Sequence, residues 1–359
     1  MDVFTSIALN YLPKARVLAS TLKRCHPEWK FHLCISDRNS ANLKLDTAGG
    51  LFDTILWIEE LDIENIYKWI FKHTVVEICT AVKGPVALSL LKRGAEKVMY
   101  IDPDIAVFNR LDEIDRLLDS HSVVLTPHLL EFEDVKSAVE DNEICALRHG
   151  VFNLGFFAVN SSSEGFHFAD WFNQRLLEFC YADIPNGLFT DQRWCDLAPT
   201  FFEDLHILRD PGCNVASWNL SRRNVTFSGD GTLLVNGSPL KFYHFTGYDS
   251  GNGNVMTLKY SGGNHIVSEI WTWYGHQLAK HGQEGLGKAK WHFDFFKNGE
   301  QIPQSARLLY RQREDLQEAF PNPFTVGKHG GYYSWFRANG AADVIKPKSW
   351  MRRIAPSWF

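Results

Sequence analysis

The chain contains no apolar run of the roughly 20 residues that a membrane-spanning helix needs. Its seven cysteines are scattered without a CxxC pair, which indicates neither a disulfide framework nor a zinc ribbon. Acidic residues outnumber basic ones by 42 to 37, and the formal net charge is -5. A protein of this charge gives no reason to expect nucleic acid as a partner.

The beginning of the chain, MDVFTSIALNYLPKARV, lacks the basic start and long apolar run of a signal peptide, and it is typical of a first strand. Together with the scattered cysteines, this favours a reducing cytoplasm. What the chain has in excess is aromatic residues, which make up 14% of it. We expect them to form a large aromatic core; stacking on a sugar or a base is the alternative.

Short apolar runs alternate with helical patterns through residue 160. This alternation predicts an α/β fold with a mostly parallel sheet covered by helices on both faces. The expected strands are residues 3–9, 31–36, 54–58, 98–101, 122–126 and 152–160. A helix is expected over residues 14–24, and a long helical region between residues 58 and 98 ends at Gly94.

After residue 160 the pattern changes. We expect helices over residues 165–180 and 266–281, and a small hairpin within residues 225–245, where GDG and NGSP are turn sequences. Residues 250–264 are rich in Gly and Asn, which predicts a mobile loop. We divide the chain into a domain of residues 1–281 and a C-terminal extension, residues 282–359, that is aromatic and hard to assign.

Two acids interrupt the otherwise apolar stretch VMYIDPDIAVF. Asp102 is the first residue beyond the strand VMYI, and ligands bind beyond the carboxyl ends of parallel strands. On an extended backbone, stiffened by Pro103, Asp102 and Asp104 would present both carboxylates to one point. A divalent cation relieves the repulsion between two such groups, and oxygen ligands suit Mg²⁺ or Mn²⁺. The alternative is an acid that caps a helix.

Five segments, in order over residues 7–249, resemble the retaining enzymes of glycosyltransferase family 8 and their bacterial relatives: IALNY, YIDPDIAVF, VFNLGFFAVN, FTDQRW and YHFTGYD. YIDPDIAVF resembles the DxD segment of GT-A-fold glycosyltransferases. The resemblance implies a Rossmann-like, mostly parallel sheet flanked by helices, with a small hairpin region. It leaves the C-terminal extension, which we expect to be helical or irregular, unexplained.

The resemblance implies a nucleotide site in the loop after the first strand. There the family holds the base and the ribose, which corresponds to Ala8, Asn10 and Tyr11 in this chain. Leu9 stands where the family has an acid, so the resemblance specifies UDP only as the family's usual nucleotide.

The resemblance also implies a metal site. Asp102 and Asp104 match the family's metal-binding pair, and His244 of YHFTGYD matches its third protein ligand. An imidazole beside two carboxylates favours Mn²⁺ over Mg²⁺, because nitrogen ligands suit softer ions.

Further residues correspond to the family's contacts with the donor sugar. Lys83 stands where the family often has a basic residue that reaches the donor; the alternative is a solvated lysine. Asn153 would contact the sugar from the strand beneath it, on which Gly155 leaves room.

Asp191 and Gln192 match a DQ pair that faces the transferred sugar. We assign both residues positioning and electrostatic roles at the catalytic centre, because an amide is a poor nucleophile. Gly247 fits a close approach of the backbone to the pyrophosphate.

One departure concerns the leaving diphosphate. The family's HxxGxxKPW motif ends with a lysine that neutralises this group, whereas Ser250 takes that place in HFTGYDSGNG. Lys259, Arg222 and Arg223 are the candidates to replace it.

These features predict metal-dependent transfer of a sugar, with retention, from a nucleotide diphosphate sugar to a hydroxyl of a bacterial glycan or glycolipid. The predicted loop over residues 250–264 would close over the donor. Three alternatives are open. A haloacid-dehalogenase-type phosphatase would carry its acids on an early strand, and the two carboxylates of a glycoside hydrolase would flank the bond. A non-catalytic subunit that binds a sugar nucleotide or a glycan would explain the missing lysine.

The acceptor would be selected by residues 127–150, a partly acidic segment, and by the C-terminal part. Residues 344–359, VIKPKSWMRRIAPSWF, combine basic residues with tryptophans. This composition favours a peripheral contact with the anionic inner face of a membrane. A C-terminal helix packed on the domain is the alternative.

Overall fold

The computed structural model describes residues 1–39, 50–327 and 330–343. Residues 344–359, with the predicted membrane contact, lie outside the described residues. The chain forms two compact units: Met1–Asp62 with Val76–Lys290, and Ile63–Val75 with Trp291–Phe359. None of the helices described is both long and apolar enough to cross a membrane. The division at residue 281 into a transferase domain and an extension remains a prediction.

The first unit is built on a seven-stranded sheet of order β10-β6-β7-β4-β1-β2-β3. All neighbouring strands are parallel except β7, which is antiparallel to β4 and β6. The strands are β1 (Asp2–Ile7), β2 (Lys30–Ile35), β3 (Thr54–Trp57), β4 (Lys97–Ile101), β6 (Val123–Pro127), β7 (Phe152–Asn160) and β10 (Leu205–Ile207). The predicted α/β class and mostly parallel sheet are confirmed; β10 was not predicted.

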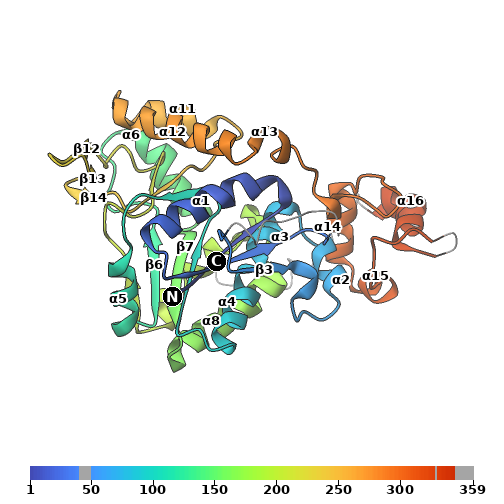
Figure 1. Ribbon diagram of the computed structural model, residues 1–359. Helices are drawn as coiled ribbons and strands as arrows, with labels where there is room; N and C mark the ends of the chain where they lie inside the picture. Colours follow the sequence, from blue (N-terminus) through green and yellow to red (C-terminus); the bar gives the residue numbers. More distant parts are fainter. Residues whose placement is uncertain (40–49, 328–329, 344–359) are drawn as a thin grey trace, which may run out of the picture. The chain divides into compact units, whose positions relative to one another are not determined.

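Helices cover both faces of this sheet (Figure 1). On one face α1 (Leu12–Cys25) packs its Leu18 into a core shared with Val3 of β1. On the other face lie α4 (Lys83–Lys92) and α8 (Ser163–Phe179), where Phe172 contacts Phe157 and Phe157 contacts Phe4 of β1. Val3 and Phe4 face opposite layers because side chains alternate along a strand.

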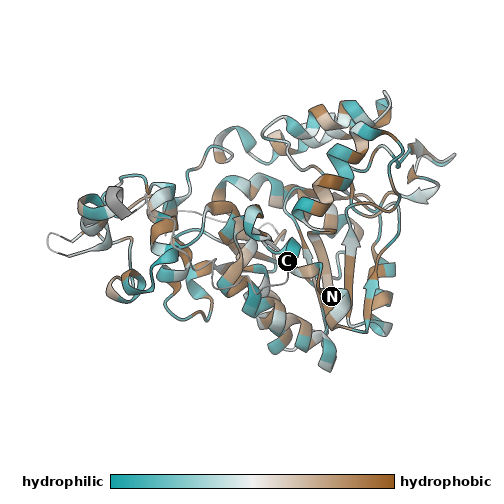
Figure 2. Cartoon of the chain, turned by 180° about the vertical axis from the view of Figure 1, so that it is seen from behind, coloured by the Kyte–Doolittle hydropathy of each residue, from teal (hydrophilic) through white to brown (hydrophobic). Residues whose placement is uncertain are grey.

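The hydropathy of the chain follows this arrangement. In Figure 2 the strands of the sheet are mostly brown, whereas the helices carry both brown and teal residues. This is the pattern of a sheet buried between amphipathic helices.

The strand order places a ligand-binding position at β1 and β4. The chain proceeds outward from β1 through β2 to β3 and then returns to β4 on the other side of β1. Open α/β sheets bind ligands at such a reversal, beyond the carboxyl ends of the strands. Here β1 continues into Ala8 and the 3₁₀ helix η1 (Leu9–Tyr11), and β4 continues into Asp102.

Three smaller sheets complete the described part of the first unit. In one of them β15 (Phe242–His244) lies between β5 (Ile105–Val107) and β11 (Val215–Ala216). The predicted hairpin region is confirmed as β12 (Val225–Phe227), β13 (Leu233–Val235) and β14 (Ser238–Pro239). The smallest sheet pairs β8 (Ala182–Asp183) with β9 (Leu188–Phe189).

The remaining helical segments of the first unit connect these sheets. They are η2 (Ile58–Glu60), α3 (Val75–Ala81), α5 (Asp112–Ser120), α6 (Lys136–Ala138), the π-helix η3 (Val139–Glu143), α7 (Ile144–His149), η4 (Ile184–Asn186), α9 (Gln192–Cys195), α10 (Ala198–Phe201), α11 (Asn252–Tyr260), α12 (His265–Lys280) and α13 (Gln283–Leu286). The predicted helices at residues 165–180 and 266–281 correspond to α8 and α12.

The prediction of a mobile loop over residues 250–264 is wrong, because α11 occupies its centre. Gly251 adopts a positive φ of 76° just before the helix. A Cβ atom on Gly253 would lie 2.1 Å from the carbonyl oxygen of Thr246 and 2.7 Å from the ring of Trp271. The glycines therefore allow a tight turn and close packing of a helix, and we do not retain the predicted loop closure.

The second unit has an aromatic core. Its helices are α2 (Ile66–Phe71), η5 (His292–Asp294), α14 (Gln304–Gln312), α15 (Glu314–Ala319) and α16 (Tyr332–Asp343). The ring of Phe71 lies 5.0 to 5.3 Å from those of Tyr310, Phe324 and Tyr332. Aromatic residues thus supply much of this core, as expected from the composition.

Close packing of α4 on α8 gives a prediction for Gly84. A Cβ atom there would lie 2.6 Å from Cα of Asn173. We expect Gly84→Ala to lower the free energy of unfolding by about 1–3 kcal/mol, the usual cost of overpacking. Urea unfolding measures it. Gly285→Ala in α13 is the matched control, because no atom of another segment in the described part of the chain lies within 4 Å of that Cβ position. Equal stability of Gly84→Ala and the wild type would contradict this packing.

Candidate active site

Three ligand-type side chains converge beyond the carboxyl end of β4. Nε2 of His244 lies 3.1 Å from Oδ1 of Asp104 and 3.7 Å from Oδ2 of Asp102. One ligand atom from each of these residues lies within 4.8 Å of the other two. The three side chains, called the ligand cluster below, are close enough to bind one cation.

Backbone pairing brings these residues together. In the antiparallel pair of β5 and β15, His244 lies opposite Ile105, and the backbone N–H of Phe245 donates to the carbonyl of Asp104. The predicted extended backbone between the two acids is wrong: Ile105 N–H donates to the carbonyl of Asp102, which closes a turn. The helix-cap alternative is also wrong, because strand β5 follows this turn.

Space for a cation depends on Gly155 of β7. A Cβ atom there would lie 2.6 Å from Cε1 of His244 and 2.9 Å from Oδ2 of Asp102. We expected the missing side chain of Gly155 to leave room for the donor sugar. The structure shows that this room lies beside the ligand cluster. Two carboxylates and one imidazole suit a divalent transition metal such as Mn²⁺, so both the donor set and the space fit.

Electrostatic interactions shift the pKa values of two members of this cluster, Asp104 and His244. Burial alone would raise the pKa of Asp104, but the charge of His244, its hydrogen bond and the ammonium of Lys14 hold the pKa of Asp104 below its usual range. Burial alone would lower the pKa of His244, but the carboxylate of Asp104 raises that pKa. The hydroxyl of Tyr100 donates to Oδ1 of Asp102 at 2.6 Å and so orients this carboxylate.

The ligand cluster borders a cavity of about 410 Å³ within the first unit. The lining includes these residues singled out from the sequence: Lys83, Asp102, Asp104, Asn153, Gly155, Asp191, Gln192 and His244. Ala8, Asn10, Tyr11 and Gly247 do not line the cavity. The first three follow β1 at the same edge of the sheet, and Gly247 follows β15.

Lys83 is buried and forms an ion pair with Asp191, so the solvated alternative is wrong. Its Nζ lies 2.7 Å from Oδ2 of Asp191 and 3.7 Å from Oδ1 of Asp102, and it donates to the carbonyl of Leu154 at 2.8 Å. Burial would lower the pKa of Lys83, but the two carboxylates raise it. Burial raises the pKa of Asp191 against the pull of Lys83. The lysine stays charged and links Asp191 to the ligand cluster.

Hydrogen bonds fix the side-chain amide of Gln192. Its Oε1 accepts from the backbone N–H of Leu154 and from Nδ2 of Asn153, both at 3.2 Å. Its Nε2 donates to the carbonyl of His149 at 3.2 Å. Nδ2 of Asn153 also donates to Nε2 of His128 at 3.1 Å. Burial lowers the pKa of His128 to about 4, so a neutral imidazole accepts this bond.

His128 is a residue that the sequence interpretation missed. It follows β6 directly, as Asp102 follows β4, and the same rule about carboxyl ends could have found it. Residues 127–150, expected on the acceptor side, form α6, η3 and α7 and contribute Asp141, Asn142, Cys145, Ala146 and His149 to the cavity.

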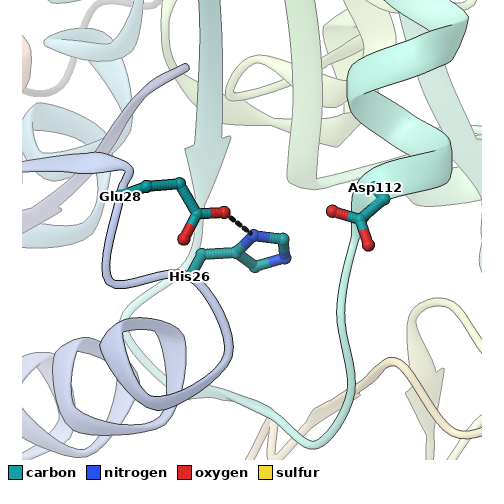
Figure 3. A group of neighbouring side chains, drawn as sticks. All are labelled: His26, Glu28 and Asp112. Atoms are coloured by element: carbon teal, nitrogen blue, oxygen red, sulfur yellow. Dashed lines mark hydrogen bonds and ion pairs between the residues drawn. The ribbon is translucent and has the colours of Figure 1, made fainter.

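A second group of ligand-type side chains, His26, Glu28 and Asp112, is already satisfied within the protein (Figure 3). Nδ1 of His26 bonds Glu28 at 2.9 Å, and Nε2 accepts the backbone N–H of Leu111 at 2.7 Å. The guanidinium of Arg110 lies 2.9 Å from Glu28 and 2.8 Å from Asp112. Both ring nitrogens and both carboxylates are engaged, so this group does not fit a metal.

No family model matches the sequence. The chain is similar to two uncharacterized proteins of Bacillus subtilis (strain 168). It is 30% identical to YfnF over 176 residues, 48% of this chain and 57% of YfnF, and 25% identical to YfnD over 204 residues, 54% of this chain and 61% of YfnD. The matches thus span less than two thirds of either relative.

Among solved structures, the chain is similar to the galactosyltransferase LgtC in complex with donor and acceptor sugar analogues. The identity is 18% and the TM-score 0.46, and the match covers 76% of this chain and 96% of LgtC.

The two groups of ligand-type side chains can be compared directly. We expect Asp104→Asn to reduce Mn²⁺ binding to below detection, because it removes a charged ligand of the cluster. Asp112→Asn is the matched control and should bind Mn²⁺ like the wild type, because Arg110 already neutralises its carboxylate. Calorimetric titration with Mn²⁺ measures both. Loss of binding in Asp112→Asn alone would place the metal at the second group.

Proposed function

We propose that this chain is a metal-dependent glycosyltransferase that moves a sugar from a nucleotide diphosphate sugar to an acceptor hydroxyl. The observation that carries the proposal is the ligand cluster of Asp102, Asp104 and His244 beyond the carboxyl end of β4. It borders a cavity that also contains Asp191 and Gln192. The five segments that resemble glycosyltransferase family 8 support the same conclusion.

The ligand cluster would hold the cation, with Mn²⁺ preferred over Mg²⁺. A bound divalent cation offsets the negative charge that grows on the leaving diphosphate. Tyr100 orients Asp102, and the space above Gly155 keeps the ligand atoms accessible. We place the base and the ribose, of UDP by the resemblance, at Ala8, Asn10 and Tyr11 after β1. Gly247 would allow the backbone to approach the diphosphate.

We propose retention without a protein nucleophile. Oε1 of Gln192 already accepts two hydrogen bonds, which engage both of its lone pairs. The carboxylate of Asp191 is buried and held by Lys83. Neither group is poised to attack the anomeric carbon. Their fixed dipole and charge would instead stabilise positive charge on the sugar as the bond to the diphosphate breaks, and Asn153 would position the sugar.

The acceptor would approach the cavity wall formed by η3 and α7. This wall presents Asp141, Asn142 and His149, which can bind hydroxyl groups. A bacterial glycan or glycolipid fits such a polar wall.

A non-catalytic subunit that binds a sugar nucleotide is the second candidate, because Ser250 replaces the lysine of the family motif. A glycosyltransferase would turn over the donor, whereas a binding subunit would not. A binding subunit would hold the donor without releasing the nucleotide.

Nucleotide release tests the proposal. The protein should hydrolyse one of a panel of UDP-, GDP- and ADP-sugars slowly in the absence of acceptor, because water replaces the acceptor hydroxyl. A chelator should abolish the release, and Mn²⁺ should restore it better than Mg²⁺. Donor binding without any release would favour the binding subunit. Neither binding nor release would contradict both candidates.

Gln192 gives a sharper test of the site. We expect Gln192→Ala to lower turnover by about 100-fold, because an interaction made in the transition state is lost. Donor affinity, measured by titration, should change much less. Gln174→Ala in α8 is the matched control, because this exposed amide bonds only Asp170 among the described residues. Normal turnover of Gln192→Ala would show that this amide does not face the sugar.

A further inference from the structure

The family motif that this chain resembles has a lysine beside the leaving diphosphate, and Lys83 does not take its place. Lys83 is held by Asp191 and by the carbonyl of Leu154. Only 2% of the Asp191 side chain is exposed. Withdrawing Lys83 would leave this carboxylate buried without its counterion, which is strongly unfavourable.

The basic residues considered from the sequence are also engaged elsewhere. Arg223 is buried and donates to a backbone carbonyl. Arg222 forms an ion pair with Asp134, and Lys259 forms one with Asp141, each at 2.5 Å. Among the described residues, neither Arg222 nor Lys259 is paired with the segment that contains Ser250.

Lys14 of α1 reaches this segment in space. Its Nζ lies 2.5 Å from Oδ2 of Asp249, the residue next to Ser250, although the two are 235 positions apart in the sequence. The same Nζ lies 3.8 Å from the ring centroid of Tyr11, a residue of the proposed nucleotide site. The ammonium thus lies between the end of η1 and the position where the family motif has its lysine.

Lys14 also interacts with the ligand cluster. Burial alone would lower the pKa of Lys14, but the carboxylate of Asp104 and other neighbouring groups raise it. In return, the ammonium contributes to holding the pKa of Asp104 down. The side chain of Lys14 is therefore charged, and the carboxylate of Asp104 favours this charge.

The partner of Lys14 can be exchanged for a ligand. The side chain of Asp249 is 43% exposed, whereas that of Asp191 is 2% exposed. The side chain of Lys14 is only 1% exposed, so Asp249 can leave it when another anion takes its place. Nζ of Lys14 donates to Asp249 and is also hydrogen-bonded to Tyr11, and an ammonium has three N–H groups, so one of them remains. It can accordingly donate to phosphate oxygens.

We infer that Lys14 is the cation that binds the diphosphate of the donor, in place of a lysine at position 250. Asp249 holds the ammonium in position until the donor binds. This assignment rests on the proposed function. It gives the diphosphate two flanking positive charges, one from the metal held by the ligand cluster and one from α1.

The test compares two lysines of α1. With Mn²⁺ present, we expect Lys14→Met to weaken the binding of UDP, GDP or ADP, whichever the wild type binds best, by at least about 10-fold, the effect of losing a charge-assisted bond. Binding of the corresponding nucleoside and of Mn²⁺ alone, measured in parallel, should weaken much less than binding of the diphosphate. Lys23→Met is the matched control, because Lys23 forms an ion pair with Asp53 at 2.7 Å and should bind all probes normally.

Asp249→Asn separates a binding role from a structural one. This variant keeps Lys14 and removes its competing carboxylate, so diphosphate binding should stay equal or become tighter. If the ion pair only stabilises the fold, Lys14→Met and Asp249→Asn should weaken binding alike, which would overturn the inference. The Asp249→Asn result decides the question even if Lys14→Met does not fold.

Different results would contradict the proposed function and the role of Lys14. Wild-type protein that binds none of the diphosphates with Mn²⁺ overturns the proposed function and the role of Lys14 with it. Wild-type protein that binds one of them, together with equal binding by Lys14→Met, overturns only the role of Lys14.

Discussion

The antiparallel pairing of β5 with β15 is the interaction on which the site depends. It places His244 opposite Ile105, directly after the turn that contains Asp102 and Asp104. Residues distant in the sequence are thereby held by backbone hydrogen bonds, not by flexible side chains alone. A metal site needs this precision, because ligand atoms that are displaced by about 0.5 Å lose the required geometry. The parallel sheet supplies the position, and the small sheet completes the ligand set.

Charge pairing explains how so many ionisable groups coexist around one cavity. Asp104 pairs with His244, Asp191 with Lys83, and Lys14 with Asp249. Isolated buried charges would be too costly, so each has a partner. The pairs differ in exposure: both members of the Lys83 pair are buried, whereas in the other pair Lys14 is buried and Asp249 is 43% exposed. A fully buried pair acts as fixed structure, and a pair with an accessible member can open for a ligand.

The sequence predicted best those features that depend on residues close together in the chain. Alternation of strands and helices gave six strands of the central sheet, and the rule about carboxyl ends gave Asp102. Contacts between residues far apart in the chain could not be predicted from the sequence. Nothing local shows that Lys14 reaches Asp249, or that Gly253 packs against Trp271 and so allows a helix where Gly and Asn suggested a loop. The side chains of Asp102 and Asp104 converge because the backbone between them forms a turn. The sequence analysis assumed an extended backbone there and so missed this turn.

Helix α11 supports the cavity wall that we propose for the acceptor. Lys259 and the hydroxyl of Tyr260, both from α11, bond Oδ2 of Asp141 at 2.5 and 2.6 Å. Asp141 lies in the π-helix η3 and lines the cavity. Such π-helical turns are often found at functional sites. The segment that was expected to move over the donor is instead an anchor for the opposite wall. The proposed selection of the acceptor by this wall would therefore depend on the packing of α11 as well as on η3 itself.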